Sequence, residues 1–291
     1  MSQIILNIII LSSLMSLISQ SFYLIYNSSK HLHLSHAITL TFGAYFTYFI
    51  SIQQNLALPF AILISIVSGI LIMLFVNHFI YTPLHNKKKE RWQILIASLG
   101  VYIVLQNLVS MIWDNQILSF RTWAVKAGHP FMGAYITDVQ IITIIASIGL
   151  LILSYLFLEK TSIGQKIKAV SSNPELSSIL GISKYKAVVW SFVIGSGLAA
   201  CAGILIAADT DMTPTMGFNW LLYAVVAMII GGLGKMRYLL LGSLLLATAQ
   251  HLSAYYLDSK WMNATAFVIL IVFLYFKPYG FSGHRIKKAE I

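Results

Sequence analysis

The sequence predicts an all-α, polytopic membrane protein that folds as a helix bundle with about eight to ten transmembrane helices. Hydrophobic residues make up 58% of the 291-residue chain, charged residues only 10%, and the mean hydropathy is +0.81. A soluble domain of this length could not hide so much apolar surface beneath a polar one. Apolar runs recur from end to end, so we expect a single transmembrane domain over residues 1–291.

Nine apolar runs account for the predicted helices, because a helix needs about 20 apolar residues to cross the hydrocarbon core. They cover residues 4–25, 34–52, 57–80, 92–113, 139–158, 187–208, 220–230, 238–256 and 262–276. The run at 220–230 is too short to span, so we expect a partial helix whose irregular end lies inside protein. The segment 114–138, with Gly128, Pro130 and Gly133, predicts an irregular loop.

The basic residues predict the orientation of the chain. If the sequence HNKKKER at 85–91 is cytoplasmic, alternation of the runs places 16 of the 19 lysines and arginines on that side. Arg121, Lys126 and Lys260 fall on the other side. The positive-inside rule therefore predicts an outer N-terminus and a cytoplasmic C-terminus. The net charge of +10 needs no nucleic acid, because a basic fringe facing the anionic headgroups of the bilayer explains it.

A long polar loop at about 159–186 carries a predicted short helix. Asn173, Pro174 and Glu175 have the order of an N-cap, a first helical position and an acidic first turn. Proline is tolerated at the first position because the N–H it lacks would have no partner there. Gly181 stands where a helix would stop, so the predicted helix is about two turns long.

One face of this predicted helix is apolar. Leu176, Ile179 and Leu180 fall at i, i+3 and i+4, whereas Ser177 lies on another face and is expected to tolerate glutamate. A brief loop outside the membrane has no core that could bury the apolar stripe. Two interpretations stay open: the stripe docks on another protein, or the helix lies on the lipid surface.

The loop and the helix after it carry a family resemblance. The segment NPELSSILGI at 173–182 is followed by basic residues and the small-residue run FVIGSGLAACAGIL at 192–205. Together they resemble the inner-membrane permease subunit of bacterial ABC importers for branched-chain amino acids. In that family the cytoplasmic loop carries a coupling helix that fits a groove on the ATPase subunit. The resemblance implies an ATPase-coupling role for Asn173, Pro174, Glu175, Leu176, Ile179, Leu180 and Gly181.

Histidines at the start of the second run are predicted to be interfacial or pore-lining, and the family resemblance favours a place in the translocation pathway for His36. His31, His33 and His36 form the motif H-L-H-L-S-H, but His31 and His33 point to different helix faces and no carboxylate accompanies them, which argues against a metal site. LHLSHA at 32–37 stands where the permease family carries asparagine, phenylalanine, alanine, histidine and glycine. His36 therefore matches the family histidine, and Ala37 replaces the glycine.

Gln106 and Asn107 lie in the middle of the run at 92–113. Amides inside a membrane must find hydrogen-bond partners, so these two side chains either hold helices together or line the pathway. The family also carries the pattern LQN, and the resemblance therefore implies a place for both residues near the pathway.

Small residues predict close helix contacts. On the run at 187–208 they recur every fourth residue, which lets another helix, or a second permease subunit, approach closely. The sequence GGLG at 231–234 matches the family's glycine-rich turn, where a tight backbone is reason enough for glycine. The predicted structural glycines are Gly195, Gly203, Gly231, Gly232 and Gly234.

Catalytic chemistry is not expected. Asp209 and Asp211 predict a solvated outer turn, because no base, nucleophile or metal set accompanies them. The chain has no G-x-x-x-x-G-K-[ST] motif, so ATP hydrolysis would need a separate chain. We expect no cofactor and no metal ion.

The resemblance implies a permease subunit in the bacterial inner membrane, embedded in the lipid bilayer. Its implied partners are separate ATP-binding subunits, a second homologous permease and an external substrate-binding protein. The implied substrates are branched-chain or other hydrophobic amino acids, with urea or short amides as the alternative within the family. The competing class is a self-sufficient secondary transporter or channel, which would need charged residues inside the apolar runs.

Overall fold

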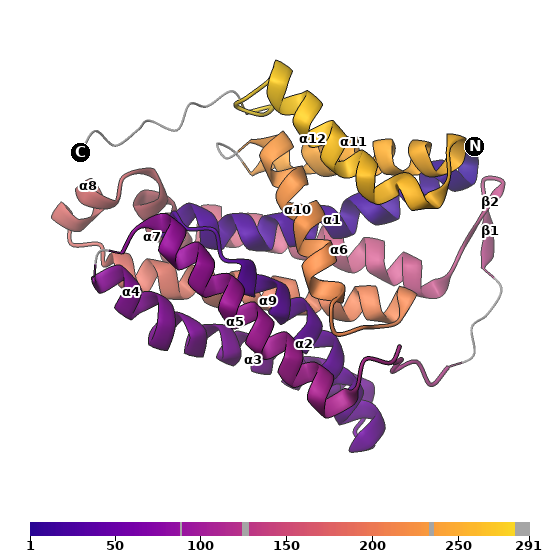
Figure 1. The fold of residues 1–291 in the computed structure, drawn as a ribbon, viewed down its shortest axis with the longest axis horizontal. Coiled ribbons are helices and arrows are strands. Elements are labelled where there is room, and N and C mark those ends of the chain that lie inside the picture. Colours follow the sequence, from indigo (N-terminus) through magenta and orange to yellow (C-terminus); the bar gives the residue numbers. More distant parts are fainter. Residues whose placement is uncertain (88, 124–127, 233–235, 283–291) are drawn as a thin grey trace.

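The computed structural model describes residues 1–87, 89–123, 128–232 and 236–282, which fold almost entirely into helices (Figure 1). The α-helices are α1 (Ser2–Ser29), α2 (Ala37–Tyr48), α3 (Leu58–Val76), α4 (Thr82–Asn86), α5 (Arg91–Trp113), α6 (Asp138–Lys160), α7 (Ser162–Ser172), α8 (Pro174–Ile179), α9 (Lys184–Thr210), α10 (Met216–Gly231), α11 (Arg237–Tyr256) and α12 (Met262–Phe276). The 3-10 turns η1 (Leu34–His36) and η4 (Ser259–Trp261) precede α2 and α12. The π-helical segments η2 (Phe49–Gln53) and η3 (Asn77–Tyr81) extend α2 and α3.

The prediction of a polytopic helical membrane protein is confirmed. Within the described ranges, six helical segments are long and apolar enough to cross a membrane. They are Ser2–Ser29, Leu58–Asn86, Arg91–Trp113, Asp138–Lys160, Lys184–Thr210 and Ser259–Phe276. The runs at 34–52 and 238–256 also form helices, as η1, α2 and η2 and as α11. The short run at 220–230 lies in α10, which has 16 residues.

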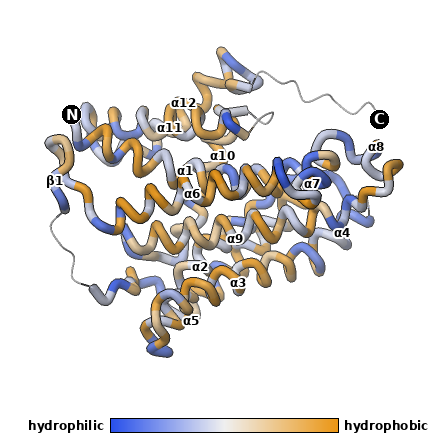
Figure 2. Tube along the Cα trace, turned by 180° about the vertical axis from the view of Figure 1, so that it is seen from behind, coloured by the Kyte–Doolittle hydropathy of each residue, from blue (hydrophilic) through white to orange (hydrophobic). Residues whose placement is uncertain are grey.

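α1 and α9 form the centre of the bundle. They pack against each other, and around them lie α2, α3, α6, α10 and α11 (Figure 1). In the most apolar 18-residue stretch of each helix, 83% is buried in α1 and 67% in α9. The corresponding shares are only 22% in α5 and 28% in α6. The outer helices therefore present apolar side chains outward, such as Leu63, Val67 and Leu71 of α3. Figure 2 shows how many hydrophobic residues lie along α3 and α6. Such a surface suits hydrocarbon rather than water.

Glycines allow α9 to touch the backbones of α1 and α2. A Cβ atom on Gly203 would lie 2.0 Å from the carbonyl oxygen of Leu40, and one on Gly195 would lie 2.7 Å from that of Ser21. Both distances are far below van der Waals contact, so a larger residue would push the helices apart. The small-residue face of α9 is thus filled by helices of the same chain.

The glycine-rich turn ends α10. A Cβ atom on Gly231 would lie 2.5 Å from the carbonyl oxygen of Tyr238. Gly232 has φ +86°, and its N–H donates to the carbonyl oxygen of Met228 at 2.9 Å. The remaining predicted structural glycine, Gly234, lies outside the described residues.

Two polar segments hold more structure than the sequence predicts. The loop at 114–138 contains an antiparallel hairpin of β1 (His129–Phe131) and β2 (Ala134–Ile136), and its turn residues Met132 and Gly133 both have positive φ, as tight hairpin turns require. The loop at 159–186 contains α7 as well as the expected short helix. α7 begins at a cap in which Thr161 Oγ1 accepts the N–H of Gly164 at 3.0 Å.

Candidate functional site

α8 lies with α4 and α7 at one end of the bundle, opposite the N-terminus (Figure 1). Asn173 is its N-cap, since Asn173 Oδ1 accepts the N–H of Leu176 at 3.0 Å. Pro174 is the first helical residue and Glu175 lies in the first turn. The helix therefore begins at the residue that the sequence indicates, and it does so through local hydrogen bonds alone.

The apolar face of α8 points away from the rest of the chain. Leu176 is 52% exposed, Ile179 81% and Leu180 70%. Three large apolar side chains on one face, beside a polar loop, form a small surface that suits contact with another protein or with lipid. We call Leu176, Ile179 and Leu180 the docking stripe.

Ser177 does not behave as its spacing predicts. Its side chain is only 3% exposed, and Ser177 Oγ donates to the carbonyl oxygen of Asn173 at 2.7 Å. α8 packs on α7 and α9 through this side, so a glutamate there would be buried without a partner. The expectation that Ser177 tolerates glutamate is wrong. The neighbouring Ser178 is exposed and lies away from the docking stripe.

A left-handed glycine turns the chain back toward the bundle after α8. Gly181 has φ +76°, its N–H donates to the carbonyl oxygen of Ser178 at 3.0 Å, and the N–H of Ile182 donates to that of Ser177 at 2.9 Å. This pattern closes a helix and favours glycine. α9 follows, so the segment that carries the docking stripe continues directly into a central helix.

His36 is buried inside the bundle. Its side chain has no exposed surface, and Nε2 lies 3.0 Å from Ser21 Oγ of α1. The ring also packs against Phe22, with ring centroids 6.0 Å apart. The residue thus joins the start of α2 to α1.

The amides of α5 bond within their own helix. Gln106 Nε2 donates to Ser110 Oγ at 3.1 Å, and Asn107 Nδ2 donates to the carbonyl oxygen of Ile103 at 2.8 Å. Asn107 is exposed on the outer face of α5, away from the core that holds His36. Among the described residues no hydrogen bond joins these amides to His36, and a pathway role for the three residues stays a prediction.

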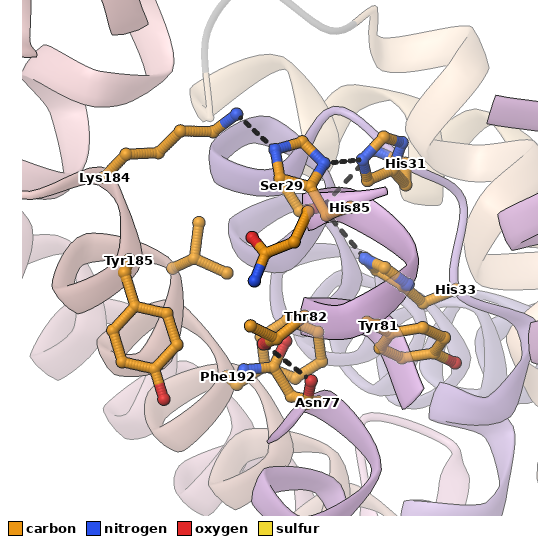
Figure 3. Close-up of a pocket in the computed structure, with 12 residues that line it drawn as sticks. Ser29, His31, His33, Asn77, Tyr81, Thr82, His85, Lys184, Tyr185 and Phe192 are labelled. Atoms are coloured by element: carbon orange, nitrogen blue, oxygen red, sulfur yellow. Dashed lines mark hydrogen bonds between the residues drawn. The ribbon is translucent and has the colours of Figure 1, made fainter. Parts of the chain in front are cut away.

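A pocket of about 230 Å³ lies at the end of the bundle that carries α4 (Figure 3). His31 Nε2 lies 3.3 Å from His85 Nδ1, and Lys184 Nζ lies 2.9 Å from His85 Nε2. His33 Nε2 lies 2.9 Å from Ser29 Oγ. The sequence motif predicted interfacial or pore-lining roles for His31 and His33 but gave no sign of His85 or Lys184, which are far away in the chain.

The charge state of His31 follows from these surroundings. Burial, together with the neighbouring His85, Lys184 and Arg91, lowers the pKa of His31 to about 4. His31 is therefore neutral at pH 7. Over the described ranges, no group of three histidine, cysteine, aspartate or glutamate side chains is placed to hold a metal ion.

An ion pair ties the loop at 114–138 to the turn between α9 and α10. Arg121 pairs with the carboxylate of Asp211, and its Nη1 donates to the carbonyl oxygen of Asp209 at 3.3 Å. Next to it, Leu118 and Met212 form a two-way backbone bridge with N···O distances of 3.1 and 2.9 Å. The expectation that Asp209 and Asp211 form a solvated turn is incomplete, because the turn is clamped by Arg121.

Replacing Arg121 with methionine should loosen this clamp. Partly exposed ion pairs contribute only about 0.2–1 kcal/mol, so we expect amide exchange at Leu118 and Met212 to rise roughly two- to fivefold without loss of the fold. Hydrogen exchange with mass spectrometry would measure this rise in amide exchange. Lys260→Met, which removes another charge predicted on the outer side, is the control. Unchanged exchange at the bridge in Arg121→Met would show that the backbone contacts hold the loop without the ion pair.

Comparison with known proteins identifies the family of this multi-pass membrane protein. Residues 4–275 match the family described as branched-chain amino acid transport system / permease component, and the chain belongs to this family. It is a permease subunit of the ABC importer class and is not itself an enzyme. Membership implies ATPase and binding-protein partners and an inner-membrane location.

Several relatives show the range of the resemblance. The chain is 29% identical over 209 residues to the high-affinity branched-chain amino acid permease LivH of Salmonella typhimurium, covering 70% of this chain and 67% of the relative. It is 25% identical to the high-affinity branched-chain amino acid permease BraD of Pseudomonas aeruginosa, covering 97% and 95%. The ribose import permease RbsC of Haemophilus influenzae is 26% identical over 64% of this chain and 60% of its own length.

Proposed function

We propose that the chain carries branched-chain or other hydrophobic amino acids across the inner membrane, as the membrane-spanning subunit of an ATP-driven importer. LivH and BraD, named for branched-chain amino acids, match it at 29% and 25% identity. The whole of residues 1–291 then acts as a single transmembrane permease domain. Its pathway would include His36, Gln106 and Asn107, of which His36 is buried and Asn107 faces outward.

The observation that carries the proposal is the exposed docking stripe on α8. The helix is capped at both ends by its own backbone and side-chain hydrogen bonds, so it holds its shape without a partner. Its apolar face is nevertheless uncovered. In an importer this face would enter a groove on a separate ATP-binding subunit, and α9 would carry movement of that subunit into the bundle.

Orientation follows from the docking role. The ATPase must meet α8 in the cytoplasm, which would place the end with α4, α7 and α8 inside and the start of α1 outside (Figure 1). Lys166, Lys168 and Lys184 lie at the inner end under this assignment, and Arg121 at the outer end. The excess of basic residues on the inner side agrees with the positive-inside rule. An external substrate-binding protein would then meet the outer loops, and a second homologous permease would complete the pathway.

Reconstitution tests the proposed function. Liposomes should contain the chain with its ATPase subunits and second permease, and the binding protein should be added outside. We expect ATP-dependent uptake of labelled leucine, with competition by valine and isoleucine but not by ribose or urea. The chain alone should move no leucine under a proton gradient. Proton-driven leucine uptake by the single chain would contradict the importer, and competition by ribose alone would move the substrate class to sugars.

A further inference from the structure

The pocket between α4, α9 and the segment after α1 collects positive charge without a carboxylate (Figure 3). Lys184 lines it, and among the described lining residues none is an aspartate or glutamate. Arg91 lies close enough to His31 to lower the pKa of its imidazole, and Lys30 lies close to Arg91. Over the described part of the chain, none of these three cations forms an ion pair, since the ion pairs there join other residues.

Hydrogen bonding directs donors into the pocket. Lysine has only donors, so Lys184 donates to His85 Nε2, which makes His85 Nδ1 the donor to His31. Lys184 keeps further N–H groups free for a ligand.

The position of the pocket indicates which anion it meets. The membrane-spanning segment Leu58–Asn86 ends at its rim, so the pocket lies at the boundary between hydrocarbon and water. Its wall includes Val188 and Phe192, which are apolar, beside the polar groups. Phosphate groups occupy this depth in a bilayer, and basic pockets between transmembrane helices suit anionic headgroups. A volume of about 230 Å³ is well above what one water molecule needs.

We propose that this pocket binds a phosphate group, with Lys184 as the direct donor and His85 holding the lysine in place. An anionic phospholipid headgroup and free inorganic phosphate present the same oxyanion, and either would occupy the site. A bound phosphate would link α4 and the start of α9. The phosphate site does not depend on which substrate the importer carries or on how the chain is oriented in the membrane.

Binding to the full-length chain tests the site. The purified, delipidated chain would be titrated with phosphatidylglycerol and with inorganic phosphate, and the bound fraction read by native mass spectrometry and by thermal protection. We expect Lys184→Gln to weaken binding about tenfold, because hydrogen bonds to charged groups contribute more than neutral ones. Lys184→Arg should retain binding. Lys186→Gln, an exposed lysine outside the pocket, is the matched control and should bind as the unchanged chain does.

Each outcome decides the question. Protection by phosphate alone supports a soluble ligand, and protection by phosphatidylglycerol but not by phosphate supports a lipid headgroup. Equal binding by Lys184→Gln and Lys186→Gln would overturn the proposal. Thermal midpoints in neutral phosphatidylcholine show whether each variant is folded.

Discussion

Leu180→Glu is expected to release the ATPase subunit from the permease while leaving the permease folded. Leu180 is 70% exposed in the chain alone, so a glutamate there meets water and should not disturb folding. In the docked complex the same carboxylate would be buried without a partner, which costs several kcal/mol. This cost corresponds to a loss of more than about a hundredfold in affinity. Co-purification of the ATPase with tagged permease measures the loss.

Ser178→Glu is the matched control for this experiment. It adds the same charge to the same helix at an exposed position away from the docking stripe, so ATPase retention should stay close to that of the unchanged chain. Both variants should elute as single species in size-exclusion chromatography. If Leu180→Glu retains the ATPase fully, the docking stripe lies on lipid and not on the partner. Equal loss in both variants would show that added charge, and not the apolar face, decides retention.

Gly203→Ala adds one methyl group and is expected to destabilise the bundle strongly, because the methyl group has no room. The added carbon would lie 2.0 Å from the carbonyl oxygen of Leu40, and the next contacts, at 2.6 and 2.7 Å, are also with the backbone of Leu40. Backbone cannot rotate away as a side chain can, so α2 and α9 must separate. Overpacking costs about 1–3 kcal/mol, and this contact should reach the upper end of that range.

Thermal unfolding in detergent checks the effect of Gly203→Ala. We expect the midpoint to fall by on the order of 5–10 °C, with aggregation in size-exclusion chromatography. Gly149→Ala in α6 is the control, because a Cβ there has nothing within 4 Å and alanine favours helix. The thermal unfolding midpoint of Gly149→Ala should stay the same or rise. A Gly203→Ala variant as stable as Gly149→Ala would mean that the helices shift apart at little cost.

Local features were readable from the sequence. The start of α8 depends on Asn173, Pro174 and the hydrogen bond from Leu176, all within four residues, so their order was enough to predict it. The docking stripe was readable because its three residues share one face by helical spacing. Ser177 shows the limit: spacing placed it on a different face, but only the contact of α8 with α7 and α9 decided that this face is buried.

The sequence by itself determined that this is a multi-pass helical membrane protein, where its apolar runs lie, and which permease family it resembles. The class and the runs follow from composition and run length, and the resemblance rests on motifs such as NPELSSILGI at 173–182. Only the tertiary structure decided that α1 and α9 form the centre, that Arg121 clamps Asp211, and that His31 meets His85 and Lys184. Such pairs come from segments far apart in the chain, and helical periodicity specifies which face is apolar but not which helix covers it.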